Sequence, residues 1–315
     1  MAHSAALGSN ERQTRDPAAA QVGGRVHRIG RREFSFDRQV AVMAVVNRTP
    51  DSFHDRGATF ALEHAVAASI RATDLGADWV DIGGVPFGRG PAVSVAEEIE
   101  RVVPVVQAIA AASDVVISVD TNRAEVARAA IAAGAAVIND TSGLGDPEMA
   151  RAIAEGQAHV VITHSVGPPR VEKPPARFVD VVADVHAFLE ERIARAEDAG
   201  IAREQIIIDP GHDLDKNTLH SLELTRRLGE FADLDLPVLV AVSNKDFVGE
   251  TLDRPRGERL SGSLAAMVAC ILNGARIVRM HDVAETVDAV RMTEAILGWR
   301  DPVRLEHNMH PTRNV

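Results

Sequence analysis

Polar residues stand at the ends of short apolar runs along this chain, and their types suit two kinds of ligand chemistry. One set combines carboxylates, an amide and an amine, which can hydrogen-bond a flat heterocycle rich in amide groups. Its members are Asp120, Asn139, Asp209 and Lys245. The other set offers donors suited to an anion, and it comprises Asn47, Arg279 and His281. Any one of these residues is as often a helix cap as a functional group, but together they predict a ligand site.

The apolar runs that precede these residues recur eight times, and most are followed by a helical pattern. They span residues 39–47, 78–84, 115–121, 135–140, 159–164, 205–210, 237–243 and 275–281. Buried apolar strands that alternate with amphipathic helices indicate a parallel sheet covered by helices. Eight such units, with no GxGxxG after the first, favour an α/β fold with a single (β/α)8 TIM-type barrel over an open doubly wound sheet. The polar residues would then share the C-terminal mouth of the barrel.

The barrel is expected over residues 25–300, between a disordered N-terminal tail over 1–24 and a C-terminal tail over 301–315. The segment 1–24 mixes Ala, Gly and both charge signs without a period that could bury one face. A formal net charge of −11 argues against nucleic acid or an anionic membrane as a partner. No apolar run has the length of a membrane span, and a single cysteine, Cys270, fits a reducing compartment. We therefore expect a cytoplasmic protein with a small-molecule ligand.

Six short motifs resemble those of the dihydropteroate synthase family, in that family's order and spacing over about residues 39–296. They are NRTPDSF (47–53), SVDT (118–121), VIND (137–140), DPG (209–211), SNK (243–245) and RMHDV (279–283). The resemblance implies an enzyme that joins 6-hydroxymethyl-7,8-dihydropterin pyrophosphate to p-aminobenzoate in folate synthesis, with Mg²⁺ assisting the departure of diphosphate.

The same resemblance implies roles for both sets of polar residues. Asp120, Asn139, Asp209 and Lys245 would hold the pterin, with Asp120 and Lys245 as catalytic residues if the protein is active. Asn47, Arg279 and His281 would hold the diphosphate, and Asn47 would bind the Mg²⁺. A built-in transition metal is not expected, because no His and Asp spacing matches a helix-face zinc pattern such as HExxH.

Several loops at the predicted mouth depart from the family's pattern. The family's GGxSTRPG loop here carries Val85, Pro86, Phe87, Gly88 and Arg89. Its MHM is Thr163, His164 and Ser165, and the arginine of its SRK is Asn244. Its Gly-Phe-Gly-Lys loop after DPG is His212, Asp213, Leu214, Asp215 and Lys216, and Arg48 fills the variable position of NxTPDSF. One such change would be drift in a tolerant loop, but the cluster suggests a retained cavity with altered or lost chemistry.

Three hypotheses follow. The first in order of support is a homologue that binds a pterin-like ligand but has little or no dihydropteroate synthase activity. The alternative is an active dihydropteroate synthase. Ranked last is an enzyme of changed specificity, acting on another amine or on a methyl-pterin as related corrinoid methyltransferases do, because nothing resembles an added corrinoid domain. A homodimer is expected through the late helices, since 262–273 is apolar over more than one face.

Overall fold

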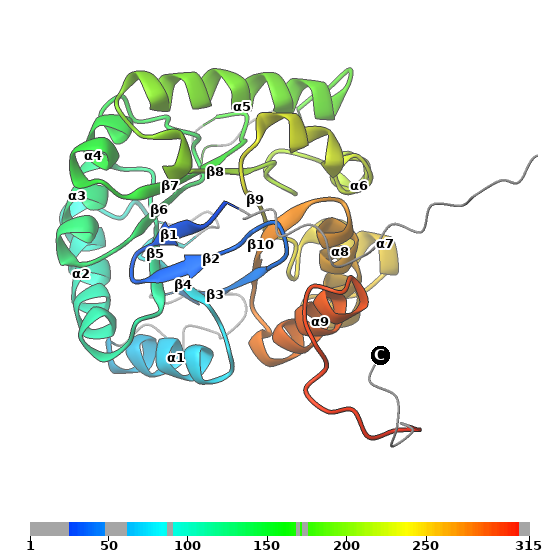
Figure 1. Ribbon diagram of the computed structural model, residues 1–315. Coiled ribbons are helices and arrows are strands. Elements are labelled where there is room, and N and C mark those ends of the chain that lie inside the picture. The colour runs from blue at the N-terminus through cyan, green and yellow to red at the C-terminus, as the bar shows by residue number, and fades with distance from the viewer. Residues whose placement is uncertain (1–24, 48–61, 87–90, 168–170, 172–175, 309–315) are drawn as a thin grey trace, which may run out of the picture.

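The computed structural model describes residues 25–47, 62–86, 91–167, 171 and 176–308. Eight parallel strands close into a barrel in the order β10-β3-β4-β5-β6-β7-β8-β9 (Figure 1). The strands are β3 (Ala41–Asn47), β4 (Trp79–Gly83), β5 (Val116–Asp120), β6 (Val137–Asp140), β7 (His159–Thr163), β8 (Ile206–Asp209), β9 (Val238–Val240) and β10 (Ala275–Met280). Each strand lies within one of the eight predicted runs, so the (β/α)8 barrel is confirmed.

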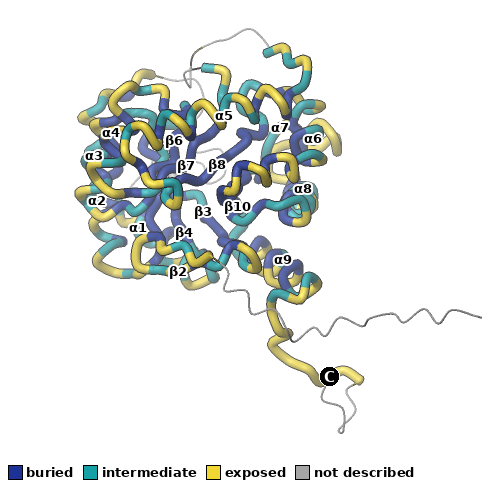
Figure 2. The backbone as a smooth tube through the Cα atoms, turned by 45° about the horizontal axis from the view of Figure 1, so that its top comes forward, coloured by how far each residue is buried: buried dark blue, intermediate teal, exposed yellow. Residues whose placement is uncertain are grey.

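The helices form a layer around the barrel, with one or two after each strand. They are α1 (Leu62–Asp74), α2 (Val95–Ala112), α3 (Ala124–Ala133), α4 (Met149–Gly156), α5 (Val181–Asp198), α6 (Thr218–Arg226), α7 (Asp246–Leu252), α8 (Leu260–Leu272) and α9 (Val283–Ile296). Short 3-10 helices occur at Arg203–Gln205 and Leu228–Leu234. In Figure 2 the buried residues concentrate in the strands and on the inner sides of the helices, and the exposed residues lie outside. None of the described helices is both long and apolar enough to cross a membrane.

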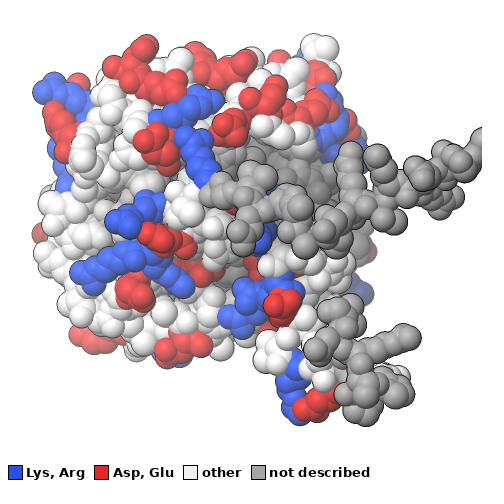
Figure 3. Space-filling view, in the orientation of Figure 1, with Lys and Arg blue, Asp and Glu red and all other residues white. Residues whose placement is uncertain are grey.

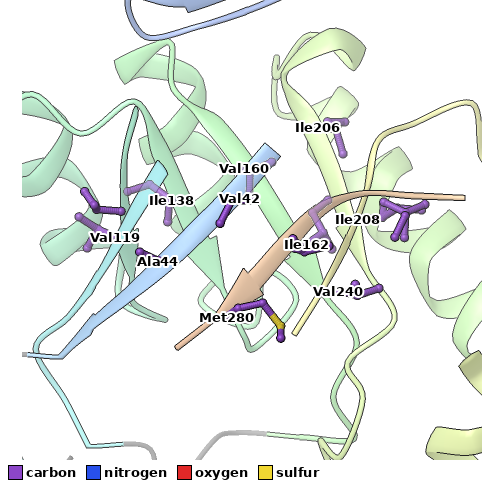
Figure 4. Packing of buried hydrophobic residues seen from close by; sticks show 14 of the residues in the cluster. Val42, Ala44, Val119, Ile138, Val160, Ile162, Ile206, Ile208, Val240 and Met280 are labelled. Carbon is purple, nitrogen blue, oxygen red and sulfur yellow. The ribbon is translucent and has the colours of Figure 1, made fainter. Parts of the chain in front are cut away.

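The core lies mainly between the barrel and its helices, because alternate strand residues face outward. Branched and apolar side chains on that outer face pack under the helices (Figure 4). They include Val42, Ala44, Val119, Ile138, Val160, Ile162, Ile208 and Met280. Apolar residues on both faces of a strand produce the near-continuous runs in the sequence, which is why those runs located the strands.

A short antiparallel hairpin that the sequence reading did not anticipate precedes the barrel. It consists of β1 (His27–Ile29) and β2 (Arg32–Phe34), and it packs against the apolar residues inside the N-terminal half of the barrel. The Phe34 and Phe36 rings stack with centroids 5.5 Å apart, and Phe34 meets Trp79 edge-on at 5.8 Å. The hairpin therefore closes the barrel end opposite the predicted mouth.

The predicted N-terminal tail over 1–24 lies outside the described residues, as do residues 309–315. The described part of the predicted C-terminal tail, residues 301–308, contains no helix or strand and is exposed.

Candidate functional site

The inward-facing side chains change from apolar to polar along the strands of the barrel. Near the N-terminal end they form one apolar cluster that includes Trp79, Val116, Val137, Ile207 and Ile277. Two residues further along the same strands they are Asp81, Ser118, Asn139, Asp209 and Arg279. Because side chains alternate with a period of two, both sets face the same interior. The polar layer therefore begins halfway through the barrel and leads to the C-terminal mouth.

Asp81, on β4, lies at the centre of this polar layer. Its side chain is fully buried, and it accepts hydrogen bonds from Ser118 Oγ at 2.6 Å and from Asn139 Nδ2 at 3.0 Å. Arg279 Nε donates to the same carboxylate at 2.6 Å. A buried carboxylate needs such donors to offset the loss of water. Asp81 lies within the predicted strand 78–84, but the sequence did not assign it to the site.

Asp120 follows on β5, nearer the mouth. Its carboxylate is 3.5 Å from Arg279 Nη2, and its side chain is 27% exposed. Burial and the neighbouring charge of Asp81 raise the pKa of Asp120 to about 7, while the Arg279 guanidinium opposes the shift. A carboxyl group that titrates near neutrality is typical of functional sites.

Asp209 ends β8 and is held by the turn that follows it. The Gly211 backbone N–H donates to Asp209 Oδ1 at 2.8 Å, and burial raises the pKa of this carboxyl. Gly211 has a φ of +71°, and a Cβ there would lie 2.1 Å from the His164 carbonyl oxygen. Only glycine fits this close approach, so the DPG motif fixes the position of the Asp209 carboxylate.

Lys245 lies just beyond β9, at the start of α7. Burial lowers its pKa, and Arg279 lowers it further, while Asp213 and Asp209 raise it. The loop before Lys245 is held by the buried Arg259, whose Nη1 donates to the Asn244 and Lys245 carbonyls at 3.0 and 3.1 Å. Lys245 therefore lies close enough to Asp209 and Arg279 for their charges to shift its pKa.

His281, after β10, is oriented by a neighbouring hydroxyl. Its Nδ1 is 2.9 Å from Ser243 Oγ, and its backbone N–H donates to the same oxygen at 3.3 Å. Asn47 is the third residue predicted to bind an anion. The structure describes its backbone, which pairs with Gly83 at the end of β3. Its side chain and the predicted loop 48–53 lie outside the description.

A buried amine that the sequence reading did not assign to the site links two mouth loops. Lys216 Nζ lies 2.8 Å from His164 Nδ1, and it donates to the Gly211 and Leu214 carbonyls at 2.9 and 3.0 Å. Burial lowers the pKa of Lys216 to about 7, and burial with the nearby Lys216 lowers that of His164 to about 3. The neutral His164 ring accepts the hydrogen bond, so Lys216 joins the loops after β7 and β8. Both residues lie in loops that correspond to family motifs, but those motifs did not predict the contact.

The two carboxylates of the loop after DPG accept hydrogen bonds from backbone N–H groups. Asp213 accepts from the first backbone N–H groups of α7 and contacts Ser221, and Asp215 Oδ2 accepts from Val166 N at 2.9 Å. Both residues have left-handed φ angles, of +63° and +55°, a conformation that glycine adopts without strain and Asp tolerates. The extra carboxylates thus stabilise the loop.

Two of the altered positions lie beside these groups. Thr163 ends β7 and pairs in register with Asp209; its hydroxyl is buried and has no hydrogen-bond partner. Asn244 adopts a left-handed φ of +56°, and its backbone N–H donates to Ser263 Oγ. A third altered residue, Ser165, donates its hydroxyl to the Gly167 carbonyl at 3.2 Å. The altered positions Phe87, Gly88, Arg89 and Arg48 fall outside the described residues. Among the residues described, no three His, Cys, Asp or Glu side chains are grouped to hold a metal ion.

The fold and site define a (β/α)8-barrel protein whose C-terminal mouth is lined by charged and hydrogen-bonding side chains. Residues 43–281 match the family model described as pterin binding enzyme, and the chain belongs to the dihydropteroate synthase family within it. "Inactive dihydropteroate synthase 2" of Mycobacterium leprae (strain TN) is 46% identical over 281 residues, covering 87% of this chain and 96% of that protein. Dihydropteroate synthase of Escherichia coli (strain K12) is 43% identical over 266 residues, covering 84% and 94%.

Solved structures agree with this assignment. Xanthomonas albilineans dihydropteroate synthase with 4-aminobenzoic acid is 40% identical and superposes with a TM-score of 0.80, covering 86% of this chain and 98% of that one. Yersinia pestis dihydropteroate synthase in a sulfonamide drug complex is 37% identical with a TM-score of 0.82, covering 88% and 100%.

Proposed function

We propose that the barrel mouth binds a pterin-like ring and that the protein has little or no dihydropteroate synthase activity. The observation that carries the proposal is a contrast between two parts of the site. The groups that would bind the edge of the ring are present and held in place, whereas the groups that would grip its faces are replaced.

The edge groups offer both hydrogen-bonding roles. Asp120 and Asp209 present carboxylate acceptors, and Lys245 presents an amine. The amide of Asn139 turns its Nδ2 toward Asp81, which leaves its oxygen to accept a hydrogen bond from a ligand. A ring with several N–H donors and a carbonyl along one edge satisfies this arrangement. A structure of the Xanthomonas albilineans relative contains 7,8-dihydropteroate, a ligand of this chemical kind.

The face groups differ from those the family resemblance predicts. Thr163 and Ser165 replace methionines, whose polarisable side chains pack well against rings. Asn244 replaces an arginine, whose planar guanidinium can stack on a ring. Each lost contact costs about 1 to 3 kcal/mol, so several losses would remove most of the binding energy for the normal substrate. The name of the Mycobacterium leprae relative, an inactive dihydropteroate synthase, agrees with this proposal.

An active dihydropteroate synthase is the second candidate. It is favoured by the intact edge groups and by the Escherichia coli relative, which carries that activity in its name. That chemistry would also use Mg²⁺, which Asn47 and the diphosphate oxygens of the substrate would hold, since Mg²⁺ is often bound through few protein oxygens together with substrate phosphates. We further propose a cytoplasmic location, on the likeness to bacterial folate enzymes.

The test combines binding, turnover and a gain-of-contact variant. Titration calorimetry with 6-hydroxymethyl-7,8-dihydropterin pyrophosphate and Mg²⁺ is expected to show weak binding, and addition of p-aminobenzoate to give turnover near background. A double change of Thr163→Met and Asn244→Arg should strengthen binding by about tenfold or more, since it restores about 1 to 3 kcal/mol per contact. Lys245→Met is the matched control and should weaken it.

Rescue of a strain that lacks its own dihydropteroate synthase would refute the proposal of lost activity. So would a kcat/KM within the ordinary enzyme range of roughly 10⁴ to 10⁸ M⁻¹s⁻¹. If neither the wild-type protein nor the double variant binds the pterin diphosphate, the mouth has a different ligand.

A further inference from the structure

We propose that Asp81 is a positioning residue that holds Arg279 away from Asp120, so that the Asp120 carboxylate stays available to a ligand. The expected effect on ligand affinity rests on the proposed function, whereas the expected effect on the pKa of Asp120 does not. Asp81 would not touch the ligand itself, because both of its carboxylate oxygens already accept hydrogen bonds from protein side chains below the mouth.

The distances show which carboxylate holds the guanidinium. Arg279 Nε donates to Asp81 at 2.6 Å, whereas Arg279 Nη2 is 3.5 Å from Asp120. The shorter contact is a charge-assisted hydrogen bond inside the barrel, and the longer one is at the limit of a hydrogen bond. The guanidinium is therefore committed to Asp81, and Asp120 keeps most of its capacity to accept.

Three further strands support Asp81 in this position. Ser118 on β5 donates to one carboxylate oxygen, and Asn139 on β6 donates to the oxygen that also binds Arg279. These donors fix the carboxylate in one orientation, since both of its oxygens are engaged. Four strands, β4, β5, β6 and β10, thus meet at a single side chain.

Removing the charge of Asp81 should release Arg279 toward its nearest remaining carboxylate. The charged groups that act on Asp120 are Asp81 on β4, Arg279 on β10, Glu98 on α2 and Asp140 at the end of β6. Of these, Asp81 raises the pKa of Asp120 most, after the effect of burial, and Arg279 lowers it. Loss of Asp81 together with a closer Arg279 should therefore lower the pKa of Asp120.

The experiment compares Asp81→Asn with Ser118→Ala. Asparagine keeps the shape and one acceptor oxygen but removes the charge, whereas Ser118→Ala removes a donor to Asp81 and leaves the charge. The Asp120 carboxyl would be titrated by ¹³C NMR in the free full-length proteins, labelled at aspartate, with Asp120→Asn identifying its signal. Binding of 6-hydroxymethylpterin would be measured by calorimetry on the same samples.

We expect Asp81→Asn to lower the Asp120 pKa by about one unit or more, as the loss of a near like charge does. Affinity for the pterin should fall by about tenfold, because a tightly paired Asp120 no longer accepts from the ring. Ser118→Ala should leave the Asp120 titration unmoved. A purely structural role for Asp81 would lower stability in both variants without moving that titration.

An Asp120 pKa that stays unchanged or rises in Asp81→Asn would overturn the inference. If that variant does not fold, Asp81→Ser, which keeps a small polar acceptor, should give the same downward shift. If the wild-type protein does not bind the pterin, the proposed function fails while the NMR titration still decides the role of Asp81.

Discussion

At the scale of single residues, the site depends on which buried polar atoms have partners. Arg279 illustrates this. The sequence predicts it as a hydrogen-bond donor to an anionic ligand, whereas two of its nitrogens contact the carboxylates of Asp81 and Asp120. The motifs predicted the residue types at the strand ends, but not the partner that each side chain has. Partner choice depends on strands that are far apart in the sequence but face each other inside the barrel, as β4 with Asp81 and β10 with Arg279 do.

A matched pair of threonines tests this view of the mouth. The Thr163 hydroxyl is buried without a partner, whereas the Thr121 hydroxyl donates to the buried Glu98 at 2.7 Å. Thr163→Val should therefore leave the free energy of unfolding unchanged or raise it, because the variant buries no unsatisfied hydroxyl. Thr121→Val should lower it by about 1 to 3 kcal/mol, since it deprives a buried carboxylate of a donor. Urea unfolding of both variants measures the difference, and equal destabilisation would show that the Thr163 hydroxyl has a partner after all.

At the scale of elements, the strands were predictable and the N-terminal hairpin was not. Each barrel strand is buried on both faces and so appears as an apolar run in the sequence. Strands β1 and β2 have three residues each, and their burial falls on Ile29, Phe34 and the nearby Phe36, which is too little to form a pattern. The Lys216 contacts were equally hidden, because they depend on how two loops fold over each other.

The close approach of those two loops makes Gly211 the sharpest test at this scale. Gly211→Ala would place a Cβ 2.1 Å from the His164 carbonyl oxygen, at a left-handed φ of +71°. Gly274→Ala is the control, since it has a left-handed φ of +111° but open space around the new Cβ. Both variants should lose about 1 kcal/mol or more from backbone strain, and Gly211→Ala should lose at least about 2 kcal/mol more from the displaced loop. Thermal unfolding of the two proteins would reveal the gap; similar losses would mean that the loops separate easily.

At the scale of the whole molecule, the distribution of charged and apolar side chains on the surface bears on whether two copies of the protein associate. Acidic side chains lie along α5 with arginines among them on the face shown in Figure 3. Large apolar side chains are exposed on the late helices, with Leu272 59%, Met292 62% and Ile296 71% exposed. Exposed apolar side chains that lie together often mark an interface, and α8 and α9, which carry these residues, pack against each other. We therefore predict the homodimer that the late helices suggested.

Light scattering with size-exclusion chromatography at micromolar concentration measures the oligomeric state directly. A double change of Met292→Glu and Ile296→Lys should shift the protein to monomer, because a charge buried in an apolar interface is costly. Val303→Glu is the control, since Val303 is also exposed but lies outside the late helices. A wild-type protein that is entirely monomeric would contradict the prediction.

The buried carboxyl of Asp120 should also make the stability of the whole molecule depend on pH. Its pKa is raised from 3.8 to about 7 by burial and by the charge of Asp81. At pH values between these two pKa values, the folded protein therefore keeps a proton that the unfolded chain has lost. Stability from this group is present below about pH 4 and is lost as the pH rises through about 7. Asp120→Asn cannot titrate at this position. Its free energy of unfolding should therefore rise relative to that of the wild type from pH 4 to 7, and the difference should stay constant above pH 7. Urea unfolding of both proteins at a series of pH values measures this difference, and a gap that does not change with pH would place the Asp120 pKa near its ordinary value.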